Sequence, residues 1–354
     1  MRLVDVHTQR SIELMKYLDF FNVNHITWSD DGRHVAVADS GGEIFIKRLL
    51  LPTPGVPKAD IEVQALASPI FKLEGQAIHY IMFNHDSSLL LVACQELGQI
   101  WSVDEATEAT MVVSGVLEGN GARRWLRHPF RKDLFAGFGV SDVVVLSWDG
   151  LEEESRHRYE EDRRGLDTTI NFNSNDDDKQ FDTGRLSLSF DADPLYGSTV
   201  NKALITYDCK HILVQIRDTS VQRKIVKRCL LFDTSTFETD CNGSLIYAFI
   251  PPQIAAIIDI PLTILPGSRF SFLDRDLWVC TLKLGTKQAE SLRRHYFIPR
   301  DWTSTNSLQQ SCMMKDGTLL FPKDDAVAVV RSALDVGGFW DFRSNQIHNM
   351  HLGN

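Results

Sequence analysis

Acidic side chains are the most numerous groups in this sequence that are capable of chemistry. Glycosidases use a pair of carboxylates as acid and base or nucleophile, and candidates for such a pair lie in several short segments. They are Asp30, Asp31, Asp39, Asp274, Asp276 and Asp316. Asp31, Asp274, Asp276 and Asp316 stand in Asp-Gly or Asp-x-Asp pairs, where a chain reverses direction and Asp favours the turn. A turn function is therefore favoured, and a hydrolase remains the alternative.

Metal ligands are not grouped in the sequence. Among the eleven histidines, His25, His34, His79 and His85 lie near the ends of expected strands, without the local spacing of a zinc site. The run Asp176–Asp178 lacks the glycine turn and the distal glutamate of a calcium-binding loop. We expect no metal site and interpret this acidic run as part of a solvated loop.

The sequence also lacks motifs that are typical of a catalytic nucleophile or of a bound cofactor. The sequence has neither a G-x-S-x-G elbow nor a G-x-x-x-x-G-K-[ST] phosphate loop. Its six cysteines form no C-x-x-C pair, and we interpret them as reduced thiols of a cytoplasmic protein. Four of them are expected to be buried in apolar runs: Cys94, Cys229, Cys280 and Cys312. We therefore predict no catalytic residue and no cofactor.

Composition limits the class of partner. The 354 residues carry a net charge of −10, which disfavours non-specific binding to nucleic acid. No apolar run is long enough to cross a membrane, and the start lacks the apolar segment of a signal peptide, so no membrane contact is expected. Two basic segments with aromatic residues, 123–128 and 293–296, are compatible with phosphate or acidic peptides, although packed strand edges are the favoured interpretation.

The elements that must position these residues are best seen in residues 24–49. Apolar alternation with a period of two predicts strands around Val35, Val37, Ile44 and Ile46. Asp31-Gly32 and Gly41-Gly42 supply the positive-φ residues of tight hairpins. The segment is thus expected to be a three-stranded antiparallel meander. Because so small a sheet is marginal alone, it must pack against further copies.

The same pattern recurs along the chain. Further three-stranded cores are expected at 78–103, 124–148, 203–232, 258–282 and 308–330, after a pair of strands within 3–20. Spacing of this kind is typical of propeller blades. We predict an all-β propeller with six or seven blades over residues 1–334, followed by a tail, 335–354. Residues 151–184 are expected to be a charged, partly disordered insertion. The first unit looks incomplete, so either these strands close a ring or the sequence continues a longer protein.

Two stretches carry a family resemblance. The run S-D-D-G-R-H-V-A-V-A-D-S-G-G-E-I-F-I-K resembles a WD repeat, and Trp148-Asp149 matches its closing dipeptide. Residues 297–302 and 315–323 are similar to the C-terminal region of fungal NACHT/WD-repeat proteins, which are NOD-like receptor (NLR) relatives. The resemblance implies the propeller of a sensor or scaffold whose NTPase is absent from this sequence. The Gly-His dipeptide of the repeat is missing, and the Trp-Asp ending occurs once.

Together these patterns predict a non-catalytic module that recognises a protein partner or ligand of unknown identity. A rigid scaffold usually recognises partners through its loops. The expected contacts lie between the second and third strand of each unit, at Asp39, Glu96, Asp142, Arg217, Arg275 and Asp324. The competing function is a propeller hydrolase that uses carboxylates facing the channel.

Overall fold

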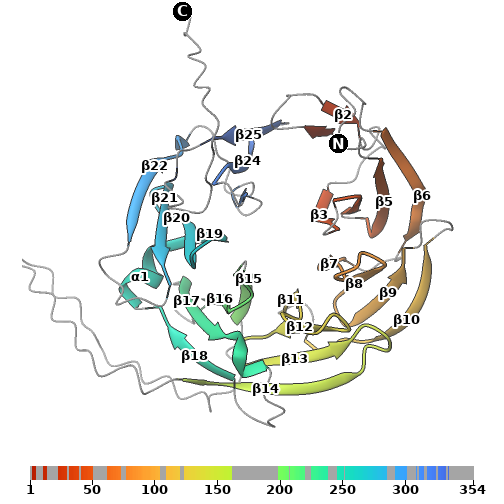
Figure 1. Ribbon diagram of the computed structural model, residues 1–354, viewed down its shortest axis with the longest axis horizontal. Helices are drawn as coiled ribbons and strands as arrows, with labels where there is room; N and C mark the ends of the chain where they lie inside the picture. Colours follow the sequence, from red (N-terminus) through yellow and green to blue (C-terminus); the bar gives the residue numbers. More distant parts are fainter. Residues whose placement is uncertain are drawn as a thin grey trace, which may run out of the picture. The chain divides into compact units, whose positions relative to one another are not determined.

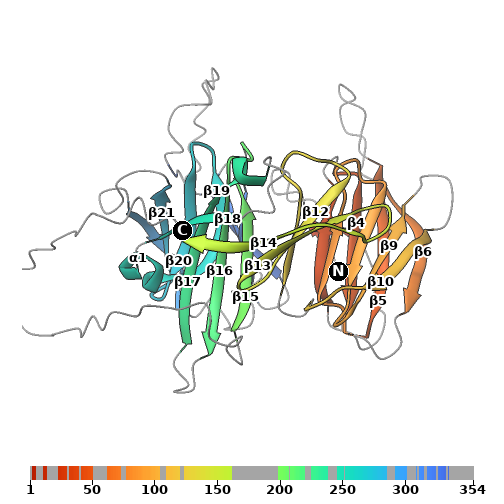
Figure 2. The ribbon, with the colours of Figure 1, turned by 90° about the horizontal axis from the view of Figure 1, so that it is seen from below.

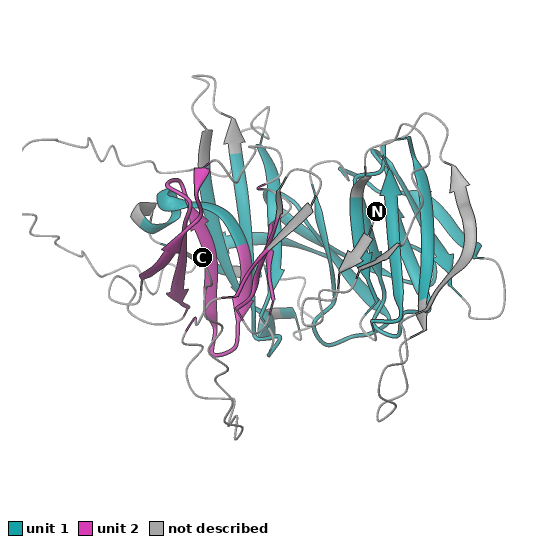
Figure 3. Cartoon of the chain, turned by 90° about the horizontal axis from the view of Figure 1, so that it is seen from above, with its two compact units in different colours: residues 1–261 teal, residues 262–354 magenta. Residues whose placement is uncertain are grey.

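The computed structural model forms two compact units, residues 1–261 and 262–354 (Figure 3). The residues that it describes are 2–4, 11–13, 23–29, 32–39, 41–50, 62–72, 77–103, 109–119, 123–161, 198–206, 208–219, 225–237, 245–250, 252–284, 292–300, 308, 311–314, 317–323, 326–331 and 334.

Four antiparallel meanders make up most of the first unit (Figure 1). Blade 1 contains β3 (Val23–Trp28), β4 (His34–Asp39), β5 (Glu43–Leu50) and β6 (Glu62–Lys72). Blade 2 contains β7 (Tyr80–Phe83), β8 (Leu89–Ala93), β9 (Leu97–Ser102) and β10 (Thr110–Val116). Blade 3 contains β11 (Arg124–Arg127), β12 (Leu134–Phe138), β13 (Asp142–Ser147) and β14 (Glu153–Glu161). Blade 4 contains β15 (Ser198–Ile205), β16 (His211–Thr219), β17 (Ile225–Asp233) and β18 (Leu245–Phe249).

The remaining elements are shorter or lie later in the chain. The first unit also has the pair β1 (Arg2–Val4) and β2 (Ser11–Glu13), the 3-10 helix η3 (Thr234–Phe237) and helix α1 (Pro252–Ile257). A fifth sheet is formed by β19 (Ile258–Leu265), β20 (Arg269–Asp274), β21 (Trp278–Lys283) and β22 (Arg293–Phe297). The unit boundary falls within β19. The last sheet has three strands, β23 (Cys312–Met313), β24 (Leu319–Lys323) and β25 (Ala326–Val330).

The inner strands of the first unit run in the same direction. At the start of β3, His25 Nε2 lies 3.0 Å from the carbonyl oxygen of Ile78, just before β7. Just after the ends of β7 and β11, His85 Nε2 lies 3.0 Å from the carbonyl oxygen of His128. These two strands are therefore also aligned. Parallel inner strands of successive four-stranded meanders are the arrangement of a propeller. The chain is thus an all-β protein of propeller type.

Adjacent blades of the first unit bury their apolar faces against each other. Blades 1 and 2 share a core that includes Ile44, Ile46, Phe83 and Leu90. Blades 2 and 3 share one built from Leu91, Ile100, Trp125, Phe135, Val144 and Trp148, and blades 3 and 4 share one built from Phe138, Tyr159, Leu230, Phe232 and Tyr247. Side chains along these strands therefore alternate between two interfaces, one with the preceding blade and one with the following blade, as strand geometry requires.

One side-chain cap recurs at the turn between the first and second strands. The side-chain oxygen of the residue after the first strand accepts the backbone N–H five residues later, at 2.8 to 3.0 Å, in three blades: Ser29 from His34, Asn84 from Leu89, and Thr206 from His211. Blade 3 has His128 here, and its Nδ1 accepts the N–H groups of Phe130 and Arg131 at 3.3 and 3.1 Å. The turns expected from sequence at these positions are confirmed as a structural repeat.

The His128 cap predicts a specific pH dependence. Burial, followed by the charge of Arg131, lowers the pKa of His128 from 6.5 to about 4; His85 and His157 also lower it, and Asp133 opposes them. The unfolded chain therefore binds a proton from about pH 6.5 downward, whereas the folded chain does not until about pH 4. The stability from neutral His128 is complete above pH 6.5, and about 2 to 3 kcal/mol is lost as the pH falls to 4.

The variant His128→Asn isolates this contribution, because Asn84 already caps the equivalent turn of blade 2. Urea unfolding at several pH values should show a smaller loss of stability between pH 6.5 and 4 in the variant than in the wild-type chain. Parallel curves for the two proteins would show that His128 does not titrate in this range on folding.

A parallel strand pair links blades 3 and 4. The end of β14 pairs with the start of β18, from Tyr159 opposite Leu245 to Glu161 opposite Tyr247, so the two blades form one eight-stranded sheet (Figure 2). Tyr159 is buried at this joint, where its ring lies 4.8 Å from that of Phe232 and its hydroxyl donates to the carbonyl oxygen of Gly139 at 3.0 Å. The long β14 thus connects the outer edges of two neighbouring blades.

The strand pattern agrees with the sequence-based expectation in its cores and differs at residues 153–161. All six expected cores are found as sheets, and the early pair is β1 and β2. Residues 153–161, expected to begin a disordered insertion, form β14, while 162–184 lie outside the described residues. The tail 335–354 also lies outside them. The domain limits and the number of blades stay predictions.

Candidate functional site

The loops that were expected to contact a partner share one end of the first unit. Because the inner strands are aligned and each meander is antiparallel, the turns between second and third strands fall on the same side. Asp39, Glu96, Asp142 and Arg217 lie at or near these turns. Arg275 occupies the equivalent turn between β20 and β21, and Asp324 lies outside the described residues. Their role in binding stays a prediction.

Two of the candidate carboxylates cap turns. Asp39 Oδ1 accepts the N–H groups of Gly41 and Glu43 at 2.9 and 2.8 Å. Asp274 Oδ1 accepts the N–H groups two and four residues later in the same way, each at 2.9 Å, and its Oδ2 pairs with Arg294 at 2.8 Å. Both carboxylates are buried. Asp30, Asp31 and Asp316 lie outside the described residues. The turn function favoured from the sequence is confirmed for Asp39 and Asp274.

The other candidates differ in what surrounds them. Glu96, Arg217 and Arg275 are exposed and open to solvent at these turns. Asp142, by contrast, joins a charged network on blade 3. Its Oδ2 pairs with Arg123 at 3.0 Å and with Arg156 at 3.1 Å. Of the expected contacts, Asp142 is therefore the one that the structure connects to a larger group of polar residues.

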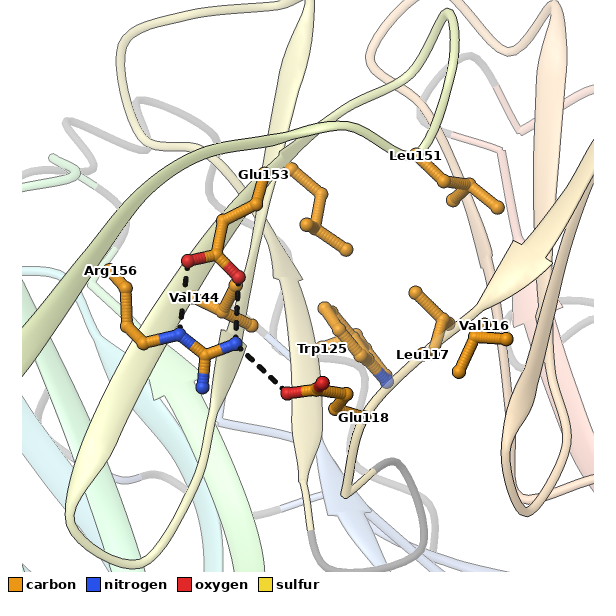
Figure 4. Close-up of a pocket in the computed structure, with 9 residues that line it drawn as sticks. Val116, Leu117, Glu118, Trp125, Val144, Leu151, Glu153 and Arg156 are labelled. Carbon is orange, nitrogen blue, oxygen red and sulfur yellow. Dashed lines mark hydrogen bonds and ion pairs between the residues drawn. The ribbon is translucent and has the colours of Figure 1, made fainter.

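Arg156, one member of this network, lines a pocket between blades 2 and 3 together with Glu153 and Glu118 (Figure 4). Arg156 on β14 pairs with Glu153 at 2.7 Å and reaches across to Glu118 of blade 2 at 3.4 Å. The hydrogen bond from Arg156 lowers the pKa of Glu153, and the same contact raises the pKa of Arg156. Both groups are therefore charged throughout the physiological range, and they hold the rim in place by ion pairing.

The floor of the pocket is apolar. A volume of about 230 Å³ is lined by Trp125, Val144 and Leu146 of blade 3, by Leu151 of the β13–β14 turn, and by Val116 and Leu117 at the end of β10. The indole of Trp125 lies at its centre and is 1% exposed (Figure 4). An apolar floor with a few charged groups at the mouth is the usual composition of a binding pocket.

Two glycines opposite each other make room for this pocket. Gly98 on β9 and Gly115 on β10 are paired in the ladder. A Cβ at Gly98 would lie 2.4 Å from Leu117 Cδ1, and one at Gly115 would lie 3.4 Å from Leu151 Cδ1. Leu117 can lean over the sheet because Gly98 has no side chain, whereas a Cβ at Gly115 would make an ordinary contact with Leu151. This arrangement cannot be predicted from local sequence patterns, because its residues belong to separate strands.

The strand beside the pocket is an exposed edge. Within the part of the chain that the structure describes, β10 pairs with β9 alone and is the outermost strand of blade 2. Met111, Val112 and Val116 on this strand are 52%, 51% and 75% exposed. Exposed apolar groups on an unpaired strand edge are unusual in a monomeric protein and mark a surface for interaction or aggregation.

The basic segments noted in the sequence are used within the chain. Trp125 is buried, Arg123 pairs with Asp142, and Arg124 Nε donates to the carbonyl oxygen of Asn201 at 3.2 Å. In the second segment, Arg294 pairs with Asp274 and stacks over Trp278 at 5.8 Å. These contacts agree with packed strand edges, the favoured interpretation of both segments.

Of the four cysteines predicted to be buried, three are buried in the structure. Burial raises the pKa of the Cys94 thiol to about 11 and those of Cys229 and Cys280 to about 12. Cys312 is exposed, so its expected burial is wrong: it lies on the two-residue strand β23, which packs one face only. No group of three metal-binding side chains is found among the described residues.

None of the helices in the described ranges has the length and apolar character needed to span a bilayer.

Comparisons with known proteins give a structural likeness without a family. No family model matches the sequence, and no curated protein matches it. Among solved structures, the chain is similar to a protein from Lactobacillus plantarum, a structural genomics target. The TM-score is 0.49 and the identity 11%, over 77% of this chain and 71% of that one. The assignment to the all-β propeller class rests on the sheets and their packing described above.

Proposed function

We propose that this chain is a non-catalytic recognition module that holds a protein partner in the pocket between blades 2 and 3. The observation that carries the proposal is a pocket lined by both apolar and charged side chains beside an exposed strand edge. Its volume of about 230 Å³ is below the roughly 300–1,000 Å³ of small-molecule sites, which favours a single inserted side chain. Interfaces commonly gain their affinity from such an anchor.

The proposed context is that of the sensor or scaffold part of an NLR-like protein in the cytoplasm. The support for this context is the resemblance of residues 297–302 and 315–323 to fungal NACHT/WD-repeat proteins. Such a module would receive its nucleotide-dependent activity from an NTPase outside this sequence. Glu96 and Arg217 in the first unit, and separately Arg275 and Asp324 in the second, are proposed as further contacts for the same or another partner.

The absence of catalysis is also a proposal, and it has a direct test. It is supported by the turn contacts that occupy Asp39 and Asp274, the two buried carboxylates among the hydrolase candidates. A screen of glycan and ester substrates should show no turnover above buffer. Turnover that is lost in Asp274→Asn or Asp276→Asn would favour the hydrolase instead.

The pocket is tested by quantitative affinity capture from an extract of cells that express the protein. Val116→Glu places a charge on the exposed edge strand that borders the pocket, on a side chain that is 75% exposed, so the fold should tolerate it. We expect capture of the specific partner to fall at least tenfold. The matched control is Phe130→Glu, at the β11–β12 turn, where another exposed apolar residue is replaced. Equal capture by wild type and Val116→Glu would contradict the assignment of the pocket.

A further inference from the structure

Among the residues that the structure describes, no strand pairs with the outer edge of β10, where backbone hydrogen-bonding groups face outward. The N–H of Leu117 donates to the carbonyl oxygen of Glu96 at 2.9 Å, toward β9. Successive N–H groups along a strand point to opposite edges, so the N–H groups of Ser114 and Val116 point away from β9. Both side chains are exposed. This edge can therefore accept an additional strand without breaking the ladder of blade 2.

The same chain already adds a strand at the next blade edge. On blade 3 the end of β14 is paired with β18, which comes from a segment much later in the chain. The outer strands of this fold are thus compatible with pairing to a further segment. Strand addition at a sheet edge is a common mode of peptide recognition, in which the backbone gives affinity and alternate side chains give specificity.

The side chains of an added strand would reach the pocket. Val113 and Leu117 pack on the blade 3 side of β10, and Gly115 faces Leu151 on that same side. Every second residue of a segment paired to β10 would therefore point to the blade 3 side, where Glu153 and Arg156 of the outer strand β14 line the pocket. The pocket lies where the ladder ends, beside Leu117.

The charge at the mouth favours a basic neighbour for the inserted side chain. Glu118 and Glu153 line the pocket together with Arg156, and Glu152 adjoins them on the β13–β14 turn. The side chain of Glu118 is 78% exposed. Arg156 pairs with three carboxylates, those of Glu118, Asp142 and Glu153, and Asp142 also pairs with Arg123. The remaining excess of negative charge is complementary to a cation two residues from the anchor, on the same face of the added strand.

We propose, resting on the function proposed above, that the partner supplies an extended segment that pairs with β10. One apolar side chain of this segment fills the pocket, and a lysine or arginine two residues away pairs with the carboxylates. The segment becomes a fifth strand of blade 2. The recognised pattern is apolar-x-basic, or its reverse, in an unstructured or strand-forming stretch of the partner.

The test uses the full chain and an array of nine-residue peptides that hold Leu, Phe or Trp at position four and Arg, Gln or Glu at position six. Binding is measured by fluorescence anisotropy. We expect Arg peptides to bind about tenfold tighter than Glu peptides, with the difference reduced in high salt. Glu118→Gln should lower this preference. N-methylation of the peptide amides that face β10 should abolish binding, whereas methylation of the alternate amides should not.

Ser114→Pro separates strand pairing from side-chain contacts, because it removes one outward N–H and no bond to β9. We expect at least tenfold weaker peptide binding with unchanged thermal unfolding. If no peptide binds better than its scrambled control while Val116→Glu still prevents capture of the partner, strand addition is wrong and the proposed function stands. If Val116→Glu also has no effect on capture, both proposals fail.

Discussion

Replacing Trp125 with alanine is expected to lower the free energy of unfolding by about 3–5 kcal/mol, as for large aromatic residues in other cores. Trp125 lies opposite Gly137 in the ladder and covers it so closely that a Cβ at Gly137 would be 2.3 Å from the indole. Its ring also packs on Phe135 with centroids 5.4 Å apart. Little side chain is available to fill the space, so a cavity should remain between blades 2 and 3.

Urea unfolding followed by circular dichroism measures this loss. Trp28→Ala is the matched control, because Trp28 lies on an inner strand but is 40% exposed; its cost should be about 1 kcal/mol or less. Similar losses for the two variants would show that Trp125 is not a central packing residue. The variant should also lose binding of the proposed peptide, since the floor of the pocket is removed.

Replacing Tyr159 with alanine is expected to destabilise the chain by a similar amount, about 3–5 kcal/mol. Tyr159 packs against Phe232 and Tyr247 where β14 meets β18, so its ring belongs to both blade 3 and blade 4. Its hydroxyl donates to the buried carbonyl oxygen of Gly139. Tyr159→Phe keeps the ring and removes this bond, which should cost about 1–3 kcal/mol.

Hydrogen exchange distinguishes a local loss of the β14–β18 pairing from a general loss of stability. In Tyr159→Ala, amides of β14 and β18 should exchange faster together, because their pairing depends on this side chain. Amides of blade 1 should change little when measured under conditions where local opening dominates. Uniform acceleration over the first unit would contradict a local role for Tyr159 at the joint.

The inner strands were predictable from sequence because both of their faces are buried. Residues 34–39 are all buried, and the run H-V-A-V-A-D ends at an Asp that caps the following turn. A short apolar run bounded by turn residues is a strong strand signal. The same signals predicted β7 to β9, β11 to β13 and β19 to β21. Turn chemistry and burial act locally here, so local sequence was sufficient.

The outer strands were not predictable in the same way. β10 reads T-M-V-V-S-G-V and is mostly exposed, while β14 reads E-E-S-R-H-R-Y-E-E and contains one large aromatic residue. Such strands pack on one side at most, and β14 is held partly by pairing with β18. Charged composition led to the expectation of disorder at residues 153–161. Pairing with a distant segment overrode that local preference.

The pocket depends on contacts that no local pattern contains. Gly98, Leu117, Trp125, Val144 and Arg156 come from different strands of two blades. The sequence analysis identified Asp142 as a possible contact because of its turn position, and the structure gives it two arginine partners. It also selected Asp39, whose carboxylate is buried in its own turn. Turn position alone therefore does not distinguish a free side chain from a capping one.

The most direct test of the recognition site is photo-crosslinking with p-benzoylphenylalanine placed at Val116 in the full chain, with Phe130 as the control position. The proposal predicts a crosslink from position 116 to one partner, at a stretch with an apolar and a basic residue separated by one residue, and none from position 130. A crosslink from position 130 without one from 116, or attachment to a helix or folded surface of the partner, would contradict it.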